Sequence, residues 1–417
     1  MGILKPKGTK DIFLTEADIW QYVEKNIRNI CRENNVSEIR TPVFEATDLY
    51  KRSVGDETDI VNKEMYTFLD KGNRSITLRP ELTAGVVRAY IENGMSSLSS
   101  PIKLWYIGNM YRYEKMQKGR YREFSQFGIE IFGSPSYLAD IESICISYEL
   151  FKRLKLEEKI VLSINSIGCK ECRKKYIDKL KKYLEKDILN MCDTCKIRYE
   201  KNPLRMLDCK EEKCKEKLKD VPVITDNLCE ECNTDFLNLQ NMLTKLKIPY
   251  VVDKTIVRGL DYYNRTVYEY VSKDLGIAAG GGGRYDGLVK MLDGNDTPAV
   301  GFALGMDRLV LILEEAGIVD NLKTNVDVYF LNLNDDGYIK AKEISMLLNE
   351  KGYVTDLDIS NRSMKAQLKY ANKLDAKYVC IVGEDELKEN KCIIKNMETG
   401  IQEESKIEFE DILSKIK

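Results

Sequence analysis

The chain of 417 residues contains no histidine. This absence excludes Ser–His and Cys–His nucleophile pairs, histidine ligands for zinc, and a side-chain imidazole as general acid or base. Any catalysis must therefore depend on carboxylates, arginine, lysine, tyrosine, a metal ion or the substrate itself.

Long apolar runs and an excess of one charge are also missing. No stretch approaches the roughly 20 apolar residues that cross a bilayer, and the N-terminal MGILKPKGTKDIF lacks the apolar segment of a secretory signal. We therefore expect a cytoplasmic protein. The net charge of -2 argues against a generally basic nucleic-acid binder, although it is compatible with a local basic face. With 43% hydrophobic and 32% charged residues, the composition is that of a globular protein of two or three domains.

Cysteine, in contrast, is plentiful, with twelve residues in the chain. Four close pairs fall within residues 169–232: Cys169/Cys172, Cys192/Cys195, Cys209/Cys214 and Cys229/Cys232. A cytosolic protein is not expected to hold them as disulfides. Their thiolates would fill two four-cysteine zinc sites, or they are reduced, buried cysteines that act as small hydrophobic residues. The spacing does not tell which pairs would share an ion.

The pattern of apolar residues predicts helices around a mostly antiparallel sheet, an α+β fold. Ile19, Val23, Ile27 and Ile30 predict an amphipathic helix over 16–34. An extended run is expected at 37–45, followed by a strand, a turn and a helix over 75–91. Strands at 102–114 and 122–133 are expected to form a hairpin, followed by a helix near 137–154. Further strands are expected at 159–165, 255–271 and 276–283, and a strand that leads into a helix over 298–317.

Two changes in residue composition and in the predicted secondary structure divide the chain. Residues 168–236 are rich in Lys, Glu and Cys, which indicates a helical insertion. Strands and helices alternate after about residue 325, which indicates a separate domain with a small, largely parallel sheet. We therefore expect one domain over 1–320 that contains the insertion, and another over 325–417.

The run GIAAGGGGRYDG, residues 276–287, has four consecutive glycines. It lacks the Lys-Ser/Thr of a phosphate loop and the spacing of a dinucleotide fingerprint. One interpretation is a strand whose bare backbone forms the floor of a site for a flat ligand, and the other is a glycine-rich hairpin. Arg258 and Tyr262 would share one face of the preceding strand, opposite Tyr263, which suits a polar substrate or a surface strand.

Three arginines lie at the ends of expected elements: Arg112, Arg120 and Arg308. A single such arginine is usually part of a surface ion pair. Three of them beside an open glycine strand favour a nucleotide whose phosphates are held by guanidinium groups. Nucleotidyl transfer depends mainly on positioning and charge, and it does not require histidine.

Six segments together resemble the histidyl-tRNA synthetases, which are class II aminoacyl-tRNA synthetases. In chain order they are EIRTPVFE, LRPELTAGVVRA, MYRYEKMQKGRYREFSQFGIEIFG, RGLDYYNRTVYEY, AAGGGGRYDGL and GFALGMDRL. The resemblance covers essentially the whole chain. RGLDYY and GGGRYDGL are specific to the histidine enzymes and to a regulatory paralogue, whereas the other segments identify only the class.

The resemblance implies a class II catalytic core, a cysteine-rich insertion and a C-terminal anticodon-binding domain. It also implies that ATP, with Mg²⁺, activates histidine to histidyl-adenylate, which is then transferred to the 3′ end of its tRNA. Pro42 lies in the segment that builds the homodimer interface of the class. The alternative is the non-catalytic, histidine-sensing regulatory paralogue of ATP phosphoribosyltransferase, which usually lacks the anticodon domain.

The resemblance assigns roles to individual residues of this chain. For ATP they are Arg112 at the α-phosphate, Glu114 at the adenine and Arg308 at the γ-phosphate. For histidine they are Glu81, Thr83 and Gln126 at the amino group, and Glu130 and Tyr263, next to Tyr262, at the imidazole. Arg258 would stabilise charge as the adenylate forms, and Gln117 and Arg120 would meet the tRNA.

Some features put parts of this assignment in doubt. Arg258 and Tyr263 lie on opposite faces of a regular strand, so a bend near Gly259 is needed to bring both into one pocket. The family often has histidine in place of Ser125 and Arg-Pro in place of Lys115 and Met116. In the C-terminal domain, Arg362, Lys365, Lys369 and Lys373 are expected on a helix that contacts tRNA or on a solvated charged face.

Overall fold

The computed structural model describes residues 2–55, 58–209, 211–319 and 325–416. The chain divides into two compact units, residues 1–321 and 322–417. The expected domain boundary, between 320 and 325, lies outside the described residues. Among the described helices, none is both long and apolar enough to cross a membrane.

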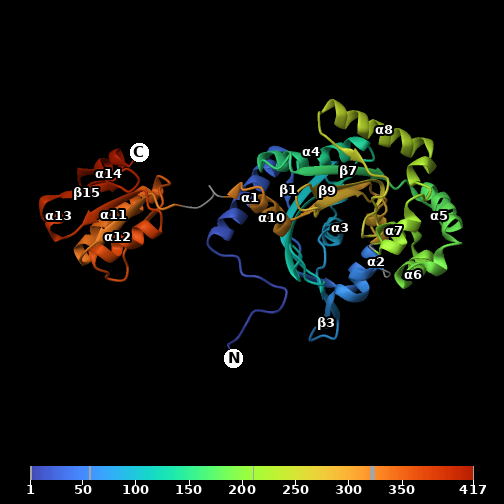
Figure 1. The fold of residues 1–417 in the computed structure, drawn as a ribbon, viewed down its shortest axis with the longest axis horizontal. Coiled ribbons are helices and arrows are strands. Elements are labelled where there is room, and N and C mark those ends of the chain that lie inside the picture. Colours follow the sequence, from blue (N-terminus) through green and yellow to red (C-terminus); the bar gives the residue numbers. More distant parts are fainter. Residues whose placement is uncertain (1, 56–57, 210, 320–324, 417) are drawn as a thin grey trace. The chain divides into compact units, whose positions relative to one another are not determined.

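A large sheet forms the centre of the first unit (Figure 1). Its strand order is β1-β5-β6-β11-β10-β9-β7-β8. The bounds are β1 Ser37–Glu38, β5 Ile102–Tyr111, β6 Glu123–Phe132, β7 Ile160–Ser166, β8 Val251–Val252, β9 Asn264–Ser272, β10 Ala278–Arg284 and β11 Ala299–Gly305. The pairs from β5 through to β7 are antiparallel, and only the outer pairs β1–β5 and β7–β8 are parallel. The prediction of a mostly antiparallel sheet is confirmed.

Helices cover both faces of this sheet because its side chains alternate between the faces. In β9, the Tyr268 hydroxyl is 2.6 Å from the Ser143 hydroxyl of α4, whereas Val267 belongs to the core that includes Val86 and Val87 of α3. The helices around the sheet are α1 Thr15–Glu33, α2 Thr47–Val54, α3 Thr83–Glu92, α4 Tyr137–Arg153, α9 Leu288–Met291 and α10 Met306–Glu315. The expected apolar face of α1 is buried, which confirms that helix.

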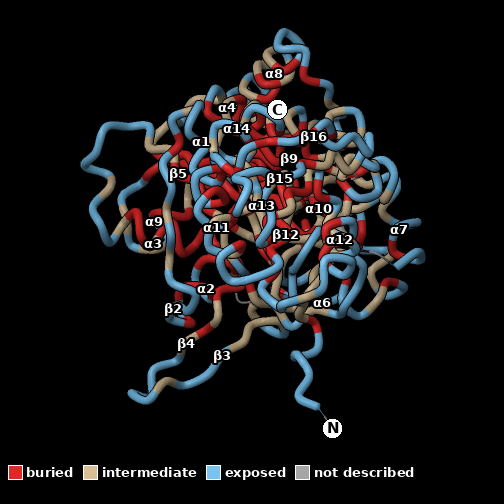
Figure 2. The backbone as a smooth tube through the Cα atoms, turned by 90° about the vertical axis from the view of Figure 1, so that its left-hand side faces the viewer, coloured by how far each residue is buried: buried red, intermediate tan, exposed pale blue. Residues whose placement is uncertain are grey.

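A smaller sheet of order β2-β4-β3 extends from this unit as a largely exposed ribbon (Figure 2). Its strands are β2 Phe44–Ala46, β3 Tyr66–Leu69 and β4 Ser75–Leu78. β4 ends two residues before Pro80, and α3 begins at Thr83, so the expected strand, turn and helix are present. Val43, Phe44, Phe68 and Leu69 are between 42% and 65% exposed, an unusual accumulation of large apolar side chains on one ribbon.

The cysteine-rich segment is helical, as its composition predicts. Its helices are α5 Lys170–Leu184, α6 Asp193–Lys201, α7 Glu212–Leu218 and α8 Glu230–Lys245, with the short 3₁₀ helix η4 Pro203–Asp208 between α6 and α7. α8 continues beyond residue 236 to Lys245, where the chain returns to the sheet through β8.

The strand predicted over 255–271 is wrong in its first half. Residues 253–263 form a loop, and β9 begins only at Asn264. In a regular strand, alternate residues of this segment would face opposite sides. The irregular backbone path of the loop instead lets side chains on both sides of Gly259 approach one site. Arg265, the second residue of β9, has a φ of 50° and lies where the pairing with β10 shifts its register.

The second unit has the sheet order β13-β12-β14-β15-β16. Its strands are β12 Val328–Asn332, β13 Thr355–Leu357, β14 Tyr378–Val382, β15 Lys391–Asn396 and β16 Gln402–Lys406. Its helices are α11 Asp335–Glu350, α12 Met364–Lys373, α13 Glu384–Glu389 and α14 Phe409–Lys415. β12, β13 and β14 are parallel, as expected, whereas β15 and β16 add an antiparallel hairpin that the sequence analysis missed.

A buried ion pair holds the end of the glycine strand. The guanidinium of Arg284, the last residue of β10, donates to the Asp140 carboxylate of α4 and to the Ser134 and Ser136 carbonyls. The two charged side chains are 2% and 1% exposed. Removal of one partner would leave a buried, uncompensated charge.

We therefore expect Asp140→Ala to lower the free energy of unfolding of this unit by about 3–5 kcal/mol. Asp296→Ala, which breaks an exposed pair with Lys290, serves as the control and should cost only about 0–1 kcal/mol. Urea unfolding followed by tryptophan fluorescence measures this, because both tryptophans, Trp20 and Trp105, lie in the first unit. Equal losses in the two variants would contradict the role given to the buried pair.

Candidate active site

A cleft lies against the β6, β10 and β11 strands of the large sheet, and loop 253–263 forms one of its walls. It is lined by ten of the residues that were singled out from the sequence: Glu81, Thr83, Arg112, Glu114, Arg120, Gln126, Arg258, Tyr262, Tyr263 and Arg308. Glu130 and Gln117 are not among the lining residues. Glu130 lies beneath the surface and is 1% exposed, whereas Gln117 is exposed in the loop that connects β5 and β6.

The glycine run is the middle strand β10, paired on both sides by β9 and β11. A Cβ on Gly281 would lie 2.7 Å from the Arg258 guanidinium, and one on Gly283 would lie 3.1 Å from the Tyr263 ring. Both side chains therefore rest on main chain that has no side chains of its own. The run is thus a strand of bare main chain beside the cleft, antiparallel to β9 and β11, and its use as the floor for a flat ligand stays a prediction.

Loop 253–263 brings Arg258 and Tyr263 together. The guanidinium carbon of Arg258 is 5.5 Å from the centre of the Tyr263 ring, within the range of a cation–π contact. Its Nη1 donates to Glu269 Oε1 over 3.2 Å, and its buried Nε has no hydrogen-bond partner among the described residues. Arg258 is thus held on one side by Glu269, while its side chain lines the cleft.

A buried carboxylate lies below the cleft. Glu130 accepts hydrogen bonds from the hydroxyls of Thr83 over 2.7 Å and Tyr106 over 3.1 Å, and from the Tyr285 hydroxyl. Burial raises the pKa of Glu130 to about 8, although the hydrogen bonds from Tyr285 and Thr83 act in the opposite direction. The three hydroxyl donors give this carboxylate a fixed orientation.

Tyrosines surround this carboxylate. The ring centroids of Tyr262 and Tyr263 are 4.7 Å apart, and those of Tyr262 and Tyr285 are 5.6 Å apart in an edge-to-face arrangement. All three rings are at most 6% exposed. A flat ligand that enters here would meet aromatic edges and faces, phenolic hydroxyls and one carboxylate.

Glu81 has a structural contact in addition to its place in the cleft. Its carboxylate accepts the backbone N–H groups of Thr83 over 2.7 Å and Ala84 over 2.9 Å, at the start of α3. Burial raises the pKa of Glu81, and these backbone hydrogen bonds oppose that shift. Gln126, opposite Gly108 and Gly305 in the sheet, contributes an amide to the same part of the cleft.

The three arginines lie together at the other end of the cleft. Arg112 donates to the Pro80 carbonyl over 2.7 Å, and Arg308 donates to the Ala278 carbonyl over 2.6 Å. Glu114 is 3.3 Å from Arg120 and 3.7 Å from Arg112. Burial lowers the pKa of Arg308, as do the positive charges of Arg120 and Arg112. Glu114 and Glu269 offset part of this positive charge, and the clustered guanidinium groups present forked donors that suit the oxygens of a polyanion.

Three residues of the site were missed in the sequence. Tyr285 follows the glycine strand directly, and Glu269 lies on β9 beside Arg258. Tyr106 is paired with Gly128 across the β5–β6 hairpin, and a Cβ on Gly128 would lie 2.3 Å from its ring. A glycine opposite a tyrosine in the hairpin was the available signal for that buried ring.

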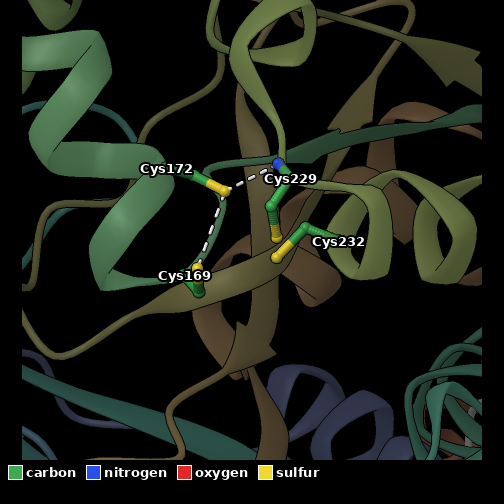
Figure 3. A group of neighbouring side chains, drawn as sticks. All are labelled: Cys169, Cys172, Cys229 and Cys232. Carbon is green, nitrogen blue, oxygen red and sulfur yellow. Dashed lines mark hydrogen bonds between the residues drawn. The ribbon is translucent and has the colours of Figure 1, made fainter.

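The eight cysteines of the insertion gather in two groups of four. Cys169, Cys172, Cys229 and Cys232 form one (Figure 3), and Cys192, Cys195, Cys209 and Cys214 form the other. Within each group the sulfur atoms lie within 4.8 Å of one another. All eight are free thiols, so the structure now assigns the pairing that the spacing left open.

The profile of the family described as histidyl-tRNA synthetase matches residues 8–309, which include the whole cleft. The chain belongs to the histidyl-tRNA synthetase family. The profile of the anticodon binding domain matches residues 327–417 of the second unit. The fold expected from the resemblance, α+β with an antiparallel-rich sheet and a C-terminal anticodon-binding domain, is thereby confirmed.

Relatives in this family match the chain from end to end. "Histidine–tRNA ligase" of Acetivibrio thermocellus is 50% identical over 414 residues, 99% of each chain, and that of Clostridium novyi is 47% identical over 402 residues, 96% of each. The crystal structure of apo S. aureus histidyl-tRNA synthetase is 37% identical, with a TM-score of 0.82 over 97% of this chain and 98% of that one.

The raised pKa of Glu130 gives a pH-dependent contribution to stability. The folded protein holds this proton up to a pH of about 8, whereas the unfolded chain loses it near 4.5. Because only the folded state carries the proton between these values, the contribution of Glu130 is fully present below 4.5 and is lost as the pH rises through about 8.

We expect Glu130→Gln to remove the pH-dependent loss of stability that this carboxyl causes. The free energy of unfolding of the variant should therefore rise relative to that of the wild type between pH 5 and pH 8. Urea unfolding at a series of pH values measures the difference. Glu315→Gln, at an exposed position of α10, should follow the wild-type profile. A pH profile of Glu130→Gln parallel to that of the wild type would contradict the buried, proton-binding carboxyl.

Proposed function

We propose that this chain is a histidine–tRNA ligase. It joins histidine and ATP into histidyl-adenylate and then transfers the histidyl group to the 3′ end of its tRNA. One observation carries the proposal: a single cleft combines a buried carboxylate among phenols, which suits a ring with two polar nitrogens, with a guanidinium cluster that suits a triphosphate. The two full-length relatives described above, which bear this name, support it.

Histidine binds with its imidazole between Glu130 and Tyr263, beside Tyr262. An imidazole presents two nitrogen atoms, and a site that pairs both rejects analogues that lack them, because each unpaired buried group costs about 1–3 kcal/mol. Glu81, Thr83 and Gln126 bind the amino group. The hydroxyls that already orient Glu130 reduce the rearrangement needed on binding.

ATP binds with its phosphates along the guanidinium groups. Arg112 holds the α-phosphate, Arg308 the γ-phosphate, and Glu114 the adenine side. A carboxylate oxygen of histidine attacks the α-phosphorus, the bond to the β-phosphate breaks, and pyrophosphate leaves. Arg258, whose side chain lines the cleft, stabilises the charge that develops on the α-phosphate.

The second step needs no side-chain imidazole. A ribose hydroxyl at the tRNA 3′ end attacks the carbonyl carbon of the adenylate, and a phosphate oxygen of the adenylate accepts the hydroxyl proton as AMP leaves. Gln117 and Arg120, on the loop between β5 and β6, meet the acceptor end. The second unit binds the anticodon, with Lys365, Lys369 and Lys373 exposed on α12 and Arg362 directly before it.

Magnesium fits the donors of this cleft. Mg²⁺ typically binds one or two carboxylates together with substrate phosphates, and Glu114 and Glu269 both line the cleft close to its arginines. When bound, the ion would share the negative charge of the phosphates with the guanidinium groups.

We also propose a cytoplasmic homodimer of two domains, bounded near 320–325. The exposed apolar residues of the smaller sheet, Phe44, Phe68 and Leu69, support an interface there, since Pro42 and its neighbours belong to the class II dimer segment. The alternative function, a histidine-sensing regulatory paralogue, is disfavoured by the complete arginine set and the matched anticodon-binding segment.

Pyrophosphate–ATP exchange with each of the twenty amino acids tests the proposed function. Histidine alone should support rapid exchange. Exchange with another amino acid, or none from folded protein, would contradict the proposal, and the second outcome would favour the regulatory paralogue.

The role of Arg258 makes a sharper prediction. Arg258→Ala should lower histidine-dependent exchange by about 10²–10³-fold, because a donor aimed at developing charge is lost. Histidine affinity, measured by calorimetry, should change by much less. Arg52→Ala, which removes an exposed arginine paired with Asp293, serves as the control and should change neither. Equal losses of exchange and histidine affinity in Arg258→Ala would show that Arg258 acts in binding.

A further inference from the structure

The two groups of cysteines in the insertion have the geometry of metal centres. Two sulfur–sulfur distances are 3.6 Å, from Cys169 to Cys172, and 3.8 Å, from Cys192 to Cys209. Four thiolates around one zinc ion at Zn–S distances of about 2.3 Å form a tetrahedron with edges of about 3.8 Å. The spacing therefore matches a single ion, and it is too small for the larger polyhedron of an iron–sulfur cluster.

Backbone amides support the sulfurs as thiolates. The N–H of Cys229 donates to Cys172 Sγ over 3.0 Å (Figure 3), and the N–H of Cys192 donates to Cys214 Sγ over 3.3 Å. Such donors stabilise metal-bound thiolates and fix their direction. Buried thiols that served only as small hydrophobic residues would have no reason to converge four at a time on one point.

The first group lies next to the loop of the active site. Arg173 directly follows Cys172, and its guanidinium donates to the Tyr263 carbonyl over 2.9 Å. Arg265 donates to Glu231 over 2.7 Å and to Asp235 over 3.0 Å, on either side of Cys232. The end of loop 253–263 is thus hydrogen-bonded to α5, and the start of β9 directly after it is bonded to α8.

The second group reaches the middle of the same loop. Between Cys195 and Cys209, Asn202 donates to the Asp261 carboxylate over 2.8 Å, and Arg205 of η4 donates to the Gly259 carbonyl over 3.4 Å. The segment that makes both contacts is closed into a loop by cysteines of one group, so an ion there would restrict its conformation.

We propose that each group binds one structural zinc ion, Cys169/Cys172 with Cys229/Cys232 and Cys192/Cys195 with Cys209/Cys214, and that the two ions hold the insertion against loop 253–263. The zinc assignment is independent of the proposed function. The consequence for catalysis depends on that function, because this loop carries Arg258 and Tyr263. Arg173 and Asn202 act as positioning residues.

Metal analysis of the full chain, purified without chelator, tests the two sites. We expect about two zinc ions per chain. Less than one zinc per chain, or iron in its place, would overturn the assignment. This measurement on the wild-type protein stays decisive even where a cysteine variant does not fold.

Double variants test the pairing. Cys169→Ser with Cys232→Ser should lose one zinc and keep the other, whereas Cys169→Ser with Cys214→Ser should lose both. The reverse result would overturn the pairing. Cys31→Ser, a buried cysteine outside both groups, is the matched control and should keep two zinc ions.

Hydrogen exchange tests the contact with the loop without any measurement of activity. Arg173→Ala should keep two zinc ions, while backbone amides of residues 255–263 exchange about tenfold faster after the loss of one hydrogen bond. Lys175→Ala, an exposed position on the same helix, should leave this exchange unchanged. Unchanged loop exchange in Arg173→Ala would overturn the positioning role, whatever the outcome of the assays for the ligase reaction.

Discussion

The close approach of Arg258 and Tyr263 to bare main chain is the constraint on which the rest of the site depends. Gly281 and Gly283 lie on β10, which is hydrogen-bonded to β9 on one side and to β11 on the other. These bonds prevent β10 from moving away from the loop to make room for side chains. A Cβ at either position would press on the main chain of β9 and also on the Arg258 guanidinium or the Tyr263 ring. At Gly280 and Gly282 a Cβ would meet the main chain of β11, so the run reflects both the close neighbouring strands and the loop side chains above Gly281 and Gly283.

Electrostatics divide the cleft into two ends with opposite preferences. At one end, a buried carboxyl with three hydroxyl donors has a raised pKa, so it gains from a ligand that brings N–H donors or positive charge. At the other end, burial and then the neighbouring guanidinium groups lower the pKa of Arg308, so this cluster gains from an anion. A ligand pair of an imidazole amino acid and a nucleoside triphosphate relieves both. A chain without histidine can do this chemistry because neither step needs an imidazole from the protein.

Local patterns predicted much of the fold because they depend on neighbours in sequence. The spacing of apolar residues identified α1, and paired apolar runs identified the β5–β6 hairpin. Loop 253–263 was assigned to a strand because alternation cannot show that tertiary contacts from the insertion hold the backbone in an irregular path. β16 was missed because it is almost entirely exposed and gives no apolar alternation, and β15 was missed although Cys392 and Ile394 are buried in the core.

The site was less predictable than the fold. Motif resemblance pointed to residues that line the cleft. Tyr285, Tyr106 and Glu269 were missed because their contacts depend on which strands pair and which residues are buried, and the identity of one residue in the sequence does not show this. The division of the eight cysteines into two groups of four likewise depends on how the helices of the insertion pack. A crystal structure with histidine and ATP bound tests the account most directly. The account predicts the imidazole between Glu130 and Tyr263 and the α-phosphate between Arg112 and Arg258. An imidazole bound away from Glu130, or phosphates away from the arginines, would contradict it.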